Sequence, residues 1–328
     1  DLSNGFRYSL LNLTLDDGLG GIDADEKNIL LIDQVPEKVT AVKHGNEPAY
    51  WVITHGWDGA DANSFYVFKI DQNGLNTTPF IFPIGDNHEE DTFVGYNPSR
   101  GYLKASPDGT LLASARGGGI VDYFELFDFN DLTGEISNRR TVGSKFSDPY
   151  GIEFSPDGTK MYLTSLVPAR LVQIDLANSN QETILPFNAS DGRFAGALQI
   201  SPYGIIYMAT GINDDFGGQP DLPAILDPDI AGLGCNFVDR YQSLGTGRVH
   251  YGLPTFIQSF FIIPSFRFEN TCFNDETEFF LEIELEDGQE IDNVIWDFGD
   301  PASGANNTIT VDTEPYGATH VFTDVGSY

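Results

Sequence analysis

The chain alternates short apolar runs with turn-forming residues over most of its length. In the clearest segments, residues 101–115 and 151–164, an apolar strand meets Ser-Pro-Asp-Gly and a second apolar strand follows. Proline fixes φ and glycine accepts a positive φ, so this tetrapeptide predicts the turn of a β-hairpin. A third copy at residues 197–209 has Ser-Pro-Tyr-Gly at the same place. The pattern therefore predicts hairpins along the chain, and it shows no convincing helix.

The hairpins repeat at a nearly constant spacing. Their Ser-Pro pairs begin at Ser106, Ser155 and Ser201, so the period is 49 and then 46 residues. Weaker copies lie at residues 38–54 and from residue 251 onward. Further strands are predicted at 64–71, 122–129, 134–141 and 170–175. Four strands per period of roughly 40–50 residues are typical of a β-propeller. We predict an all-β fold with a β-propeller of about five to seven four-stranded blades, and leave open whether its ring is complete in this chain.

The C-terminal part has a different pattern. Short strands are predicted at 279–285, 294–300 and 308–311 around Trp296, as in an immunoglobulin-like β-sandwich whose last strand is truncated here. From Phe268 to Tyr328 there is no Lys or Arg but 15 Asp and Glu. Such a change in charge marks a domain boundary. We predict a propeller over 1–267 and a sandwich over 268–328.

The overall charge excludes several classes of partner. The chain has 17 Lys and Arg against 49 Asp and Glu, a formal net charge of −32. Binding to nucleic acid needs a cationic face, and so does docking on anionic lipid. No apolar stretch reaches the roughly 18 residues of a spanning helix. We therefore expect no nucleic-acid partner and no membrane span in this chain.

Two motifs in the C-terminal part identify a resemblance. Trp296-Asp-Phe-Gly-Asp300 and His320-Val-Phe-Thr-Asp-Val-Gly-Ser-Tyr328 resemble the pattern of the polycystic-kidney-disease (PKD) domain. The propeller part resembles secreted and surface proteins of Bacteroidetes that carry a gliding-motility-associated C-terminal region. The segments that carry this second resemblance are 8–21, 37–44, 50–57, the Ser-Pro-Asp-Gly repeats and 251–260.

The resemblance implies a location and a partner. Such proteins are extracellular or lie on the outer cell surface, and the type IX secretion machinery exports them. They have a signal peptide and further propeller sequence before the position of Asp1, and a sorting domain beyond that of Tyr328, so we expect this chain to be a piece of a longer one. The family pattern supplies no catalytic residues.

Few residues suggest a site by their chemistry. Cys235 and Cys272 are the two cysteines, and an even count in a secreted chain favours a disulfide, with two separately buried thiols as the alternative. Asp297 and Asp300 form an acidic turn that either binds calcium or caps backbone amides. His88 precedes Glu89, Glu90 and Asp91, which suggests either a metal site or, more simply, a solvated charged loop.

Motifs for nucleophilic catalysis or phosphate binding are missing from the sequence. There is no G-x-S-x-G elbow, and Gly117–Gly119 lies between predicted strands rather than before a helix. We therefore predict a non-enzymatic extracellular binding or display protein, adhesive or a secretion cargo, with a cell-surface protein or glycan as ligand. The alternatives are a propeller hydrolase or lactonase with a metal in its channel, and an inert spacer. No cofactor is predicted, although calcium stays open.

Overall fold

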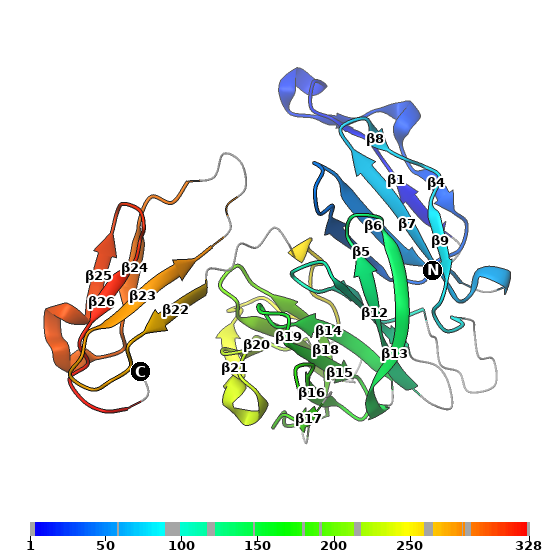
Figure 1. The fold of residues 1–328 in the computed structure, drawn as a ribbon. Helices are drawn as coiled ribbons and strands as arrows, with labels where there is room; N and C mark the ends of the chain where they lie inside the picture. The colour runs from blue at the N-terminus through cyan, green and yellow to red at the C-terminus, as the bar shows by residue number, and fades with distance from the viewer. Residues whose placement is uncertain are drawn as a thin grey trace. The chain divides into compact units, whose positions relative to one another are not determined.

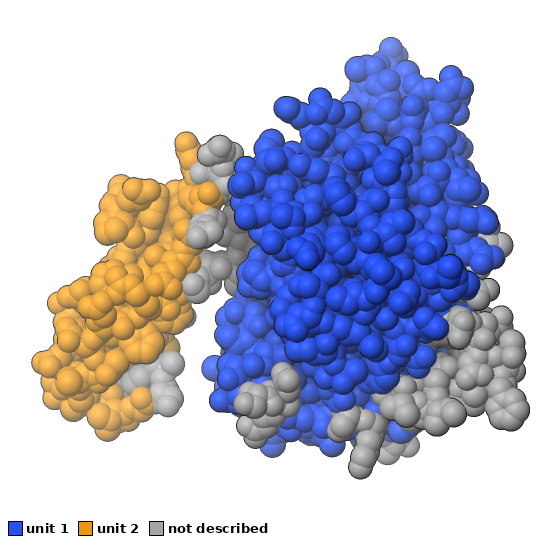
Figure 2. All heavy atoms as spheres, turned by 45° about the vertical axis from the view of Figure 1, so that its right-hand side comes forward, with its two compact units in different colours: residues 1–261 blue, residues 262–328 orange. Residues whose placement is uncertain are grey.

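A computed structural model describes most of the chain and divides it into two compact units. Unit 1 spans residues 1–261 and unit 2 spans residues 262–328 (Figures 1 and 2). The described residues are 4–57, 59–88, 99–116, 122–146, 148–178, 181–189, 192–212, 218–258, 265–283, 285 and 290–326. The boundary predicted after residue 267 falls inside β22 (Ser265–Glu269), the first strand of unit 2.

Among the described residues, the main part of unit 1 consists of four antiparallel sheets of four or five strands, whose strands largely follow the order of the chain. The first sheet holds β5 (Val39–Lys43), β6 (Tyr50–His55), β7 (Ser64–Asp71) and β8 (Gly74–Leu75), with β9 (Phe80–Pro83) also paired to β7. The second holds β10 (Leu103–Ala105), β11 (Leu111–Arg116), β12 (Asp122–Asn130) and β13 (Glu135–Phe146). The third holds β14 (Pro149–Phe154), β15 (Lys160–Ser165), β16 (Arg170–Asp175) and β17 (Gln181–Ile184). The fourth holds β18 (Arg193–Ile200), β19 (Ile206–Ile212), β20 (Asp221–Ile225) and β21 (Phe237–Ser243).

The Ser-Pro-Asp-Gly turns join the first two strands of the second and third sheets, as the sequence predicts. In the second sheet, the Ser106 amide donates to the Leu111 carbonyl, and the Leu111 amide donates to the Ser106 hydroxyl. Gly109 has a φ of 71°, a left-handed conformation that favours glycine. Gly158 has a φ of 69° at the equivalent place in the third sheet. The repeated tetrapeptide therefore forms the same closed turn twice.

Successive sheets enclose apolar clusters between them. Phe65, Leu112 and Phe127 belong to the cluster between the first and second sheets, and each is fully buried. Phe124 and Phe154 are buried between the second and third sheets in the same way. Strands with side chains buried on both faces lie in a sheet that is covered on both sides. This packing explains why β14 and β15 are buried along their whole length.

The architecture confirms an all-β fold with the sheet pattern of a propeller. Consecutive sheets contact each other through their first strands, β5 with β10, β10 with β14, and β14 with β18. These first strands are therefore the inner strands of the unit. The described residues form four sheets of this kind, fewer than the five to seven predicted. Copies at 38–54, 101–115, 151–164 and 197–209 each start one sheet, whereas the segment at 251–258 is extended without a sheet of its own.

Small elements precede the first sheet. The pairs are β1 (Phe6–Tyr8) with β4 (Ile29–Ile32) and β2 (Leu11–Asn12) with β3 (Gly21–Ile22). Helical segments in the described part of the chain are short 3-10 turns: η2 (Asp16–Gly18), η3 (Ala24–Glu26), η4 (Gly59–Asp61), η5 (Gly232–Cys235) and η7 (Pro301–Asn307). Among the described residues, no helix has the length and apolar character needed to cross a bilayer.

Unit 2 consists of two small antiparallel sheets. One holds β22, β23 (Thr277–Glu282) and β26 (Ala318–His320), and the other holds β24 (Val294–Asp297) and β25 (Thr308–Val311). Trp296 is 8% exposed between them, and its indole N–H donates to the Tyr316 carbonyl at 2.9 Å. The Phe279 ring lies 5.8 Å from the Trp296 ring and 5.2 Å from that of Phe298, between ring centroids. The tryptophan picked out in the sequence is therefore the centre of this unit's core.

Candidate functional site

A buried ion pair joins three inner strands of unit 1. Lys104 on β10, Glu153 on β14 and Gln199 on β18 each lie two residues before the serine of their turn. The Lys104 Nζ lies 3.1 Å from Glu153 Oε2 and 2.6 Å from Gln199 Oε1. Both charged side chains are fully buried. The repeat thus brings one polar side chain from each sheet to the same point between the inner strands.

The Glu153 carboxylate accepts several further hydrogen bonds. The Ile200 amide donates to Oε2 at 3.0 Å, and the Phe154 amide donates to Oε1 at 3.0 Å. Gln258, from the segment after the fourth sheet, donates to Oε1 as well. A buried charge is tolerated when its partner and its hydrogen bonds are complete. Because this carboxylate is saturated and inaccessible, we assign it a structural role.

A small pocket lies at the start of the inner strands. It has a volume of about 190 Å³. Its lining comes from the starts of β5, β10 and β14 and from the segment after the fourth sheet: Glu37, Val39, Gly101, Tyr102, Leu103, Tyr150 and Thr255. We call it the inner-strand pocket. Three sheets therefore contribute to one hollow, a common position for ligand sites in folds of this kind.

Two groups in the inner-strand pocket are suited to acid–base chemistry. The Glu37 side chain is exposed, and the structure records one hydrogen bond to its carboxylate, from the Gly101 amide at 2.8 Å. Tyr150 is 8% exposed, and no hydrogen bond from its hydroxyl to a described residue is recorded. Burial, and then the negative charge of Glu37, raise the pKa of Tyr150, so the phenol keeps its proton at neutral pH. A carboxylate that can accept a proton thus lies in one pocket with a hydroxyl that can donate a hydrogen bond.

Tyr102 has a different role in the pocket. Its hydroxyl donates to the Leu253 carbonyl at 2.8 Å and accepts from the Leu253 amide at 3.1 Å. The Lys104 Nζ lies 5.5 Å from the centre of its ring. Because the Tyr102 hydroxyl already donates one hydrogen bond and accepts another, we assign Tyr102 to the structure of the pocket wall and not to hydrogen bonding with a ligand.

A second polar cluster lies between the first and second sheets. His55, at the end of β6, and His88, after β9, are fully buried, with ring centroids 3.9 Å apart and an angle of 27° between the rings. The solvated loop expected around His88 is therefore wrong for this residue. Glu89, Glu90 and Asp91 lie outside the described residues. No sequence pattern indicates this pair, because His55 and His88 come together only through the packing of the segment after β9.

The predicted calcium candidates lie in the turn after β24. The Asp300 carboxylate accepts from Thr323, through its amide at 2.9 Å and its hydroxyl at 2.6 Å, and contacts His320 Nε2 at 3.1 Å. Asp297 Oδ1 accepts from the Gly299 amide and the Asn307 side chain. These contacts are the capping alternative considered from the sequence. Among the described residues, no group of three His, Cys, Asp or Glu is placed to hold a metal, and calcium binding stays a prediction.

Both cysteines are free thiols in the structure. Cys235 is buried in unit 1, and Cys272 is exposed in unit 2. The predicted disulfide between them is not formed here and stays a prediction. Burial raises the pKa of the Cys235 thiol, so little thiolate forms at neutral pH.

The two thiols are therefore expected to react at different rates. With a thiol-specific reagent at pH 8, Cys272 should react within the mixing time and Cys235 only after denaturation. Mass spectrometry of the labelled peptides identifies each residue, and Cys272→Ser serves as the control that removes the fast phase. A native protein with no fast thiol, restored by reduction, would instead support the disulfide.

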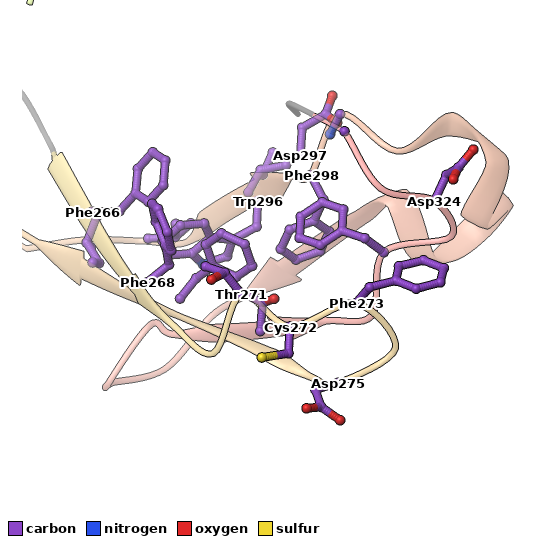
Figure 3. A pocket seen from close by; sticks show the side chains of 18 of the residues that line it. Phe266, Phe268, Thr271, Cys272, Phe273, Asp275, Trp296, Asp297, Phe298 and Asp324 are labelled. Carbon is purple, nitrogen blue, oxygen red and sulfur yellow. The ribbon is translucent and has the colours of Figure 1, made fainter.

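Unit 2 has a larger groove that is lined mainly by apolar side chains, several of them aromatic. Its volume is about 950 Å³, and Figure 3 shows Phe266, Phe268, Trp296 and Phe298 gathered along it. Phe266 and Phe268 are each more than half exposed. The lining is the open side of the unit's own core. Since it brings no acid–base pair together, we place the candidate site in the inner-strand pocket of unit 1.

Comparisons with known proteins yield structural likenesses and no sequence relatives. No family model matches the chain, and no curated protein matches it. A Bacteroides fragilis protein described as a 6-phosphogluconolactonase has 14% identity and a TM-score of 0.48, over 96% of this chain and 82% of that one. The periplasmic gluconolactonase of Pseudomonas aeruginosa has 14% identity and a TM-score of 0.47, over 83% of this chain and 71% of that one. A Bacteroides uniformis protein described as a 6-phosphogluconolactonase has 14% identity and a TM-score of 0.45, and the alignment covers 68% of this chain and 61% of that one.

These likenesses correct the main functional prediction. The expectation of a non-enzymatic binding or display protein is wrong, because the similar structures are described as lactonases, which agrees better with the hydrolase alternative. The sequence analysis searched for motifs contiguous in the chain. Glu37 and Tyr150, which line the inner-strand pocket together, form no such motif.

Proposed function

We propose that the inner-strand pocket hydrolyses a small cyclic ester, with Glu37 as general base and Tyr150 as hydrogen-bond donor to the carbonyl oxygen. The observation that carries the proposal is the pairing of these two groups in one pocket. Glu37 is open to solvent, and Tyr150 keeps a protonated hydroxyl with no recorded protein partner among the described residues. The pocket volume of about 190 Å³ suits a single small ring.

In the proposed reaction, Glu37 and Tyr150 each act on one part of the hydrolysis. Glu37 accepts a proton from water as the water oxygen attacks the carbonyl carbon. The Tyr150 hydroxyl donates a hydrogen bond to the oxyanion that develops in the tetrahedral intermediate. When the ring C–O bond breaks, the proton on Glu37 passes to the leaving alkoxide, and a hydroxy acid is released. Glu37 is the one carboxylate in the described lining, and no step of this scheme involves a metal.

Loss of the base should abolish most of the activity. In a pH-stat assay with a panel of small lactones that includes glucono-δ-lactone, we expect Glu37→Gln to lower kcat by about 100-fold. Tyr150→Phe should lower kcat by a similar factor of about 100, because it removes the donor to the oxyanion.

The matched controls are Glu135→Gln and Tyr203→Phe, which change exposed side chains outside the pocket. Both should hydrolyse lactones at the wild-type rate. Wild-type turnover by Glu37→Gln, or no lactone hydrolysis by the wild-type protein, would overturn the proposal.

We also propose that unit 2 is a PKD-like sandwich and that the protein works outside the cytoplasm. The motif residues support the first part, because Trp296 and Phe298 form the core and Asp300, after β24, contacts His320 at the end of β26. Cell fractionation with an antibody against unit 1 tests the second part. Recovery of the full protein only in the cytoplasm would contradict it.

A further inference from the structure

A short segment of the first sheet connects it to the second. Residues 84–88 follow β9 and are held to their own sheet by amide hydrogen bonds, Gly85 to the Asn63 carbonyl at 2.9 Å and His88 to the Ala62 carbonyl at 2.8 Å. Between them, Asp86 reaches the second sheet, where its amide donates to Glu125 Oε1 at 3.1 Å. We call residues 84–88 the bridging segment. The bridging segment therefore contacts both sheets, and we call this set of contacts the joint between the first and second sheets.

The Asp86 carboxylate has several partners on the second sheet. The Arg139 guanidinium lies 3.4 Å from Oδ2, and the Arg116 guanidinium lies 3.7 Å from it. The Tyr123 hydroxyl donates to the same oxygen. Arg139 also contacts Glu125 through Nε at 2.5 Å. Two carboxylates and two guanidinium groups therefore form one network on this side of the joint.

The last residue of the bridging segment, His88, packs on a second buried histidine, His55 of the first sheet. His88 stacks on His55, and the edge of the Phe65 ring packs against His55 at 4.5 Å between centroids. His55 Nδ1 lies 2.9 Å from the Gly56 carbonyl, which can only accept, so Nδ1 carries the proton of the neutral ring. His55 Nε2 and both nitrogens of His88 are buried, and no described residue is recorded as their hydrogen-bond partner. Within the described part of the chain, neither ring therefore has an acceptor in place for a second proton.

Charges of both signs lie near the pair. Lys38 before β5 acts on both histidines and Arg116 on β11 acts on His88, whereas Asp86 acts on His55 with the opposite sign. Among the described residues, Asp86 and Glu125 are the acids of the adjoining network, and both contact the Arg139 guanidinium. Burial is the main cause that lowers the pKa of His55 to about 3; Lys38 lowers it as well, whereas the Gly56 carbonyl and Asp86 raise it. Burial, and then His55, Lys38 and Arg116, lower the pKa of His88 well below its usual value. An unfolded histidine titrates near 6.5.

We propose that the His55–His88 pair makes the joint between the first and second sheets open at mildly acidic pH. Opening exposes both rings to water, where they bind protons that the closed joint excludes. The sign follows from linkage: a depressed folded-state pKa gives stability that is present above 6.5 and is lost as the pH falls toward 3.

Hydrogen exchange measured by mass spectrometry tests the proposal on the intact chain. Between pH 7 and pH 5, after correction for the intrinsic exchange rate, protection of peptides covering the bridging segment should fall by at least about 25-fold, the contribution of His55 alone. Protection of β14 to β16 should change much less over this range. His55→Phe keeps the aromatic ring against Phe65 but cannot be protonated, so it should reduce the fall by about 25-fold.

Two control variants separate this mechanism from others. His250→Gln changes an exposed histidine and should leave the pH dependence as in the wild type. Glu125→Gln removes the buried acid of the network, and the pH dependence should persist because it resides in the histidines. Equal protection at pH 7 and pH 5 in the wild type would overturn the proposal, as would a pH dependence lost in Glu125→Gln and kept in His55→Phe. The wild-type comparison alone still decides if His55→Phe does not fold.

Discussion

Replacing Lys104 with methionine is expected to destabilise unit 1 by about 3–5 kcal/mol. The substitution leaves the Glu153 carboxylate fully buried without its cation, and it leaves the Gln199 side-chain oxygen without its donor. The loss of free energy of unfolding is measured by urea denaturation followed by far-ultraviolet circular dichroism. It is far larger than the effect of an exposed ion pair, because water cannot solvate the abandoned charge.

Two further variants make the Lys104 measurement specific. Lys69→Met breaks an exposed pair with Glu47, and we expect it to cost no more than about 1 kcal/mol. The double variant Lys104→Met with Glu153→Met removes both charges, so it should be more stable than Lys104→Met alone. If Lys104→Met unfolds at the wild-type urea concentration, the ion pair does not hold the inner strands together.

The second large effect is expected in unit 2. Trp296→Ala should cost about 3–5 kcal/mol, because it removes the largest side chain of the core and leaves a cavity. A domain of this size has a net stability of roughly the same magnitude, so unit 2 should be largely unfolded in the variant. Hydrogen exchange by mass spectrometry should show full exchange in β22 to β26 while the sheets of unit 1 stay protected.

The neighbouring residue provides the control. Ile295 precedes Trp296 on β24 and is 64% exposed, so its side chain points away from the core. Ile295→Ala should leave the protection of unit 2 nearly unchanged, since exposed substitutions cost within about 0.5 kcal/mol. Equal protection of unit 2 in Trp296→Ala and Ile295→Ala would show that the aromatic cluster is not its core.

The repeat made the buried cluster of Lys104, Glu153 and Gln199 partly recoverable from the sequence. Lys104, Glu153 and Gln199 occupy one position of the template, two residues before the turn serine. An alignment of the three copies therefore shows a polar residue at the same position of β10, β14 and β18, next to mostly apolar residues. What it does not show is that the three side chains meet, because their distances depend on how the sheets pack around the inner strands.

The acid–base groups could not be found in this way. Glu37 lies before the first strand of its sheet, and Tyr150 lies at the second position of β14, so they occupy unrelated positions of the repeat. No motif search joins them, since their proximity depends on contacts among three sheets.

The hairpins, their spacing and the C-terminal module around Trp296 were all predicted from the amino-acid sequence. Those features depend on local physics: alternation of apolar residues, turns that require proline and glycine, and a change in charge along the chain. Three contacts became visible in the folded structure alone. Lys104 pairs with Glu153, Glu37 lines the same pocket as Tyr150, and His88 stacks on His55. Each of these contacts joins residues far apart in the chain, and its geometry depends on the packing of whole sheets rather than on any local pattern.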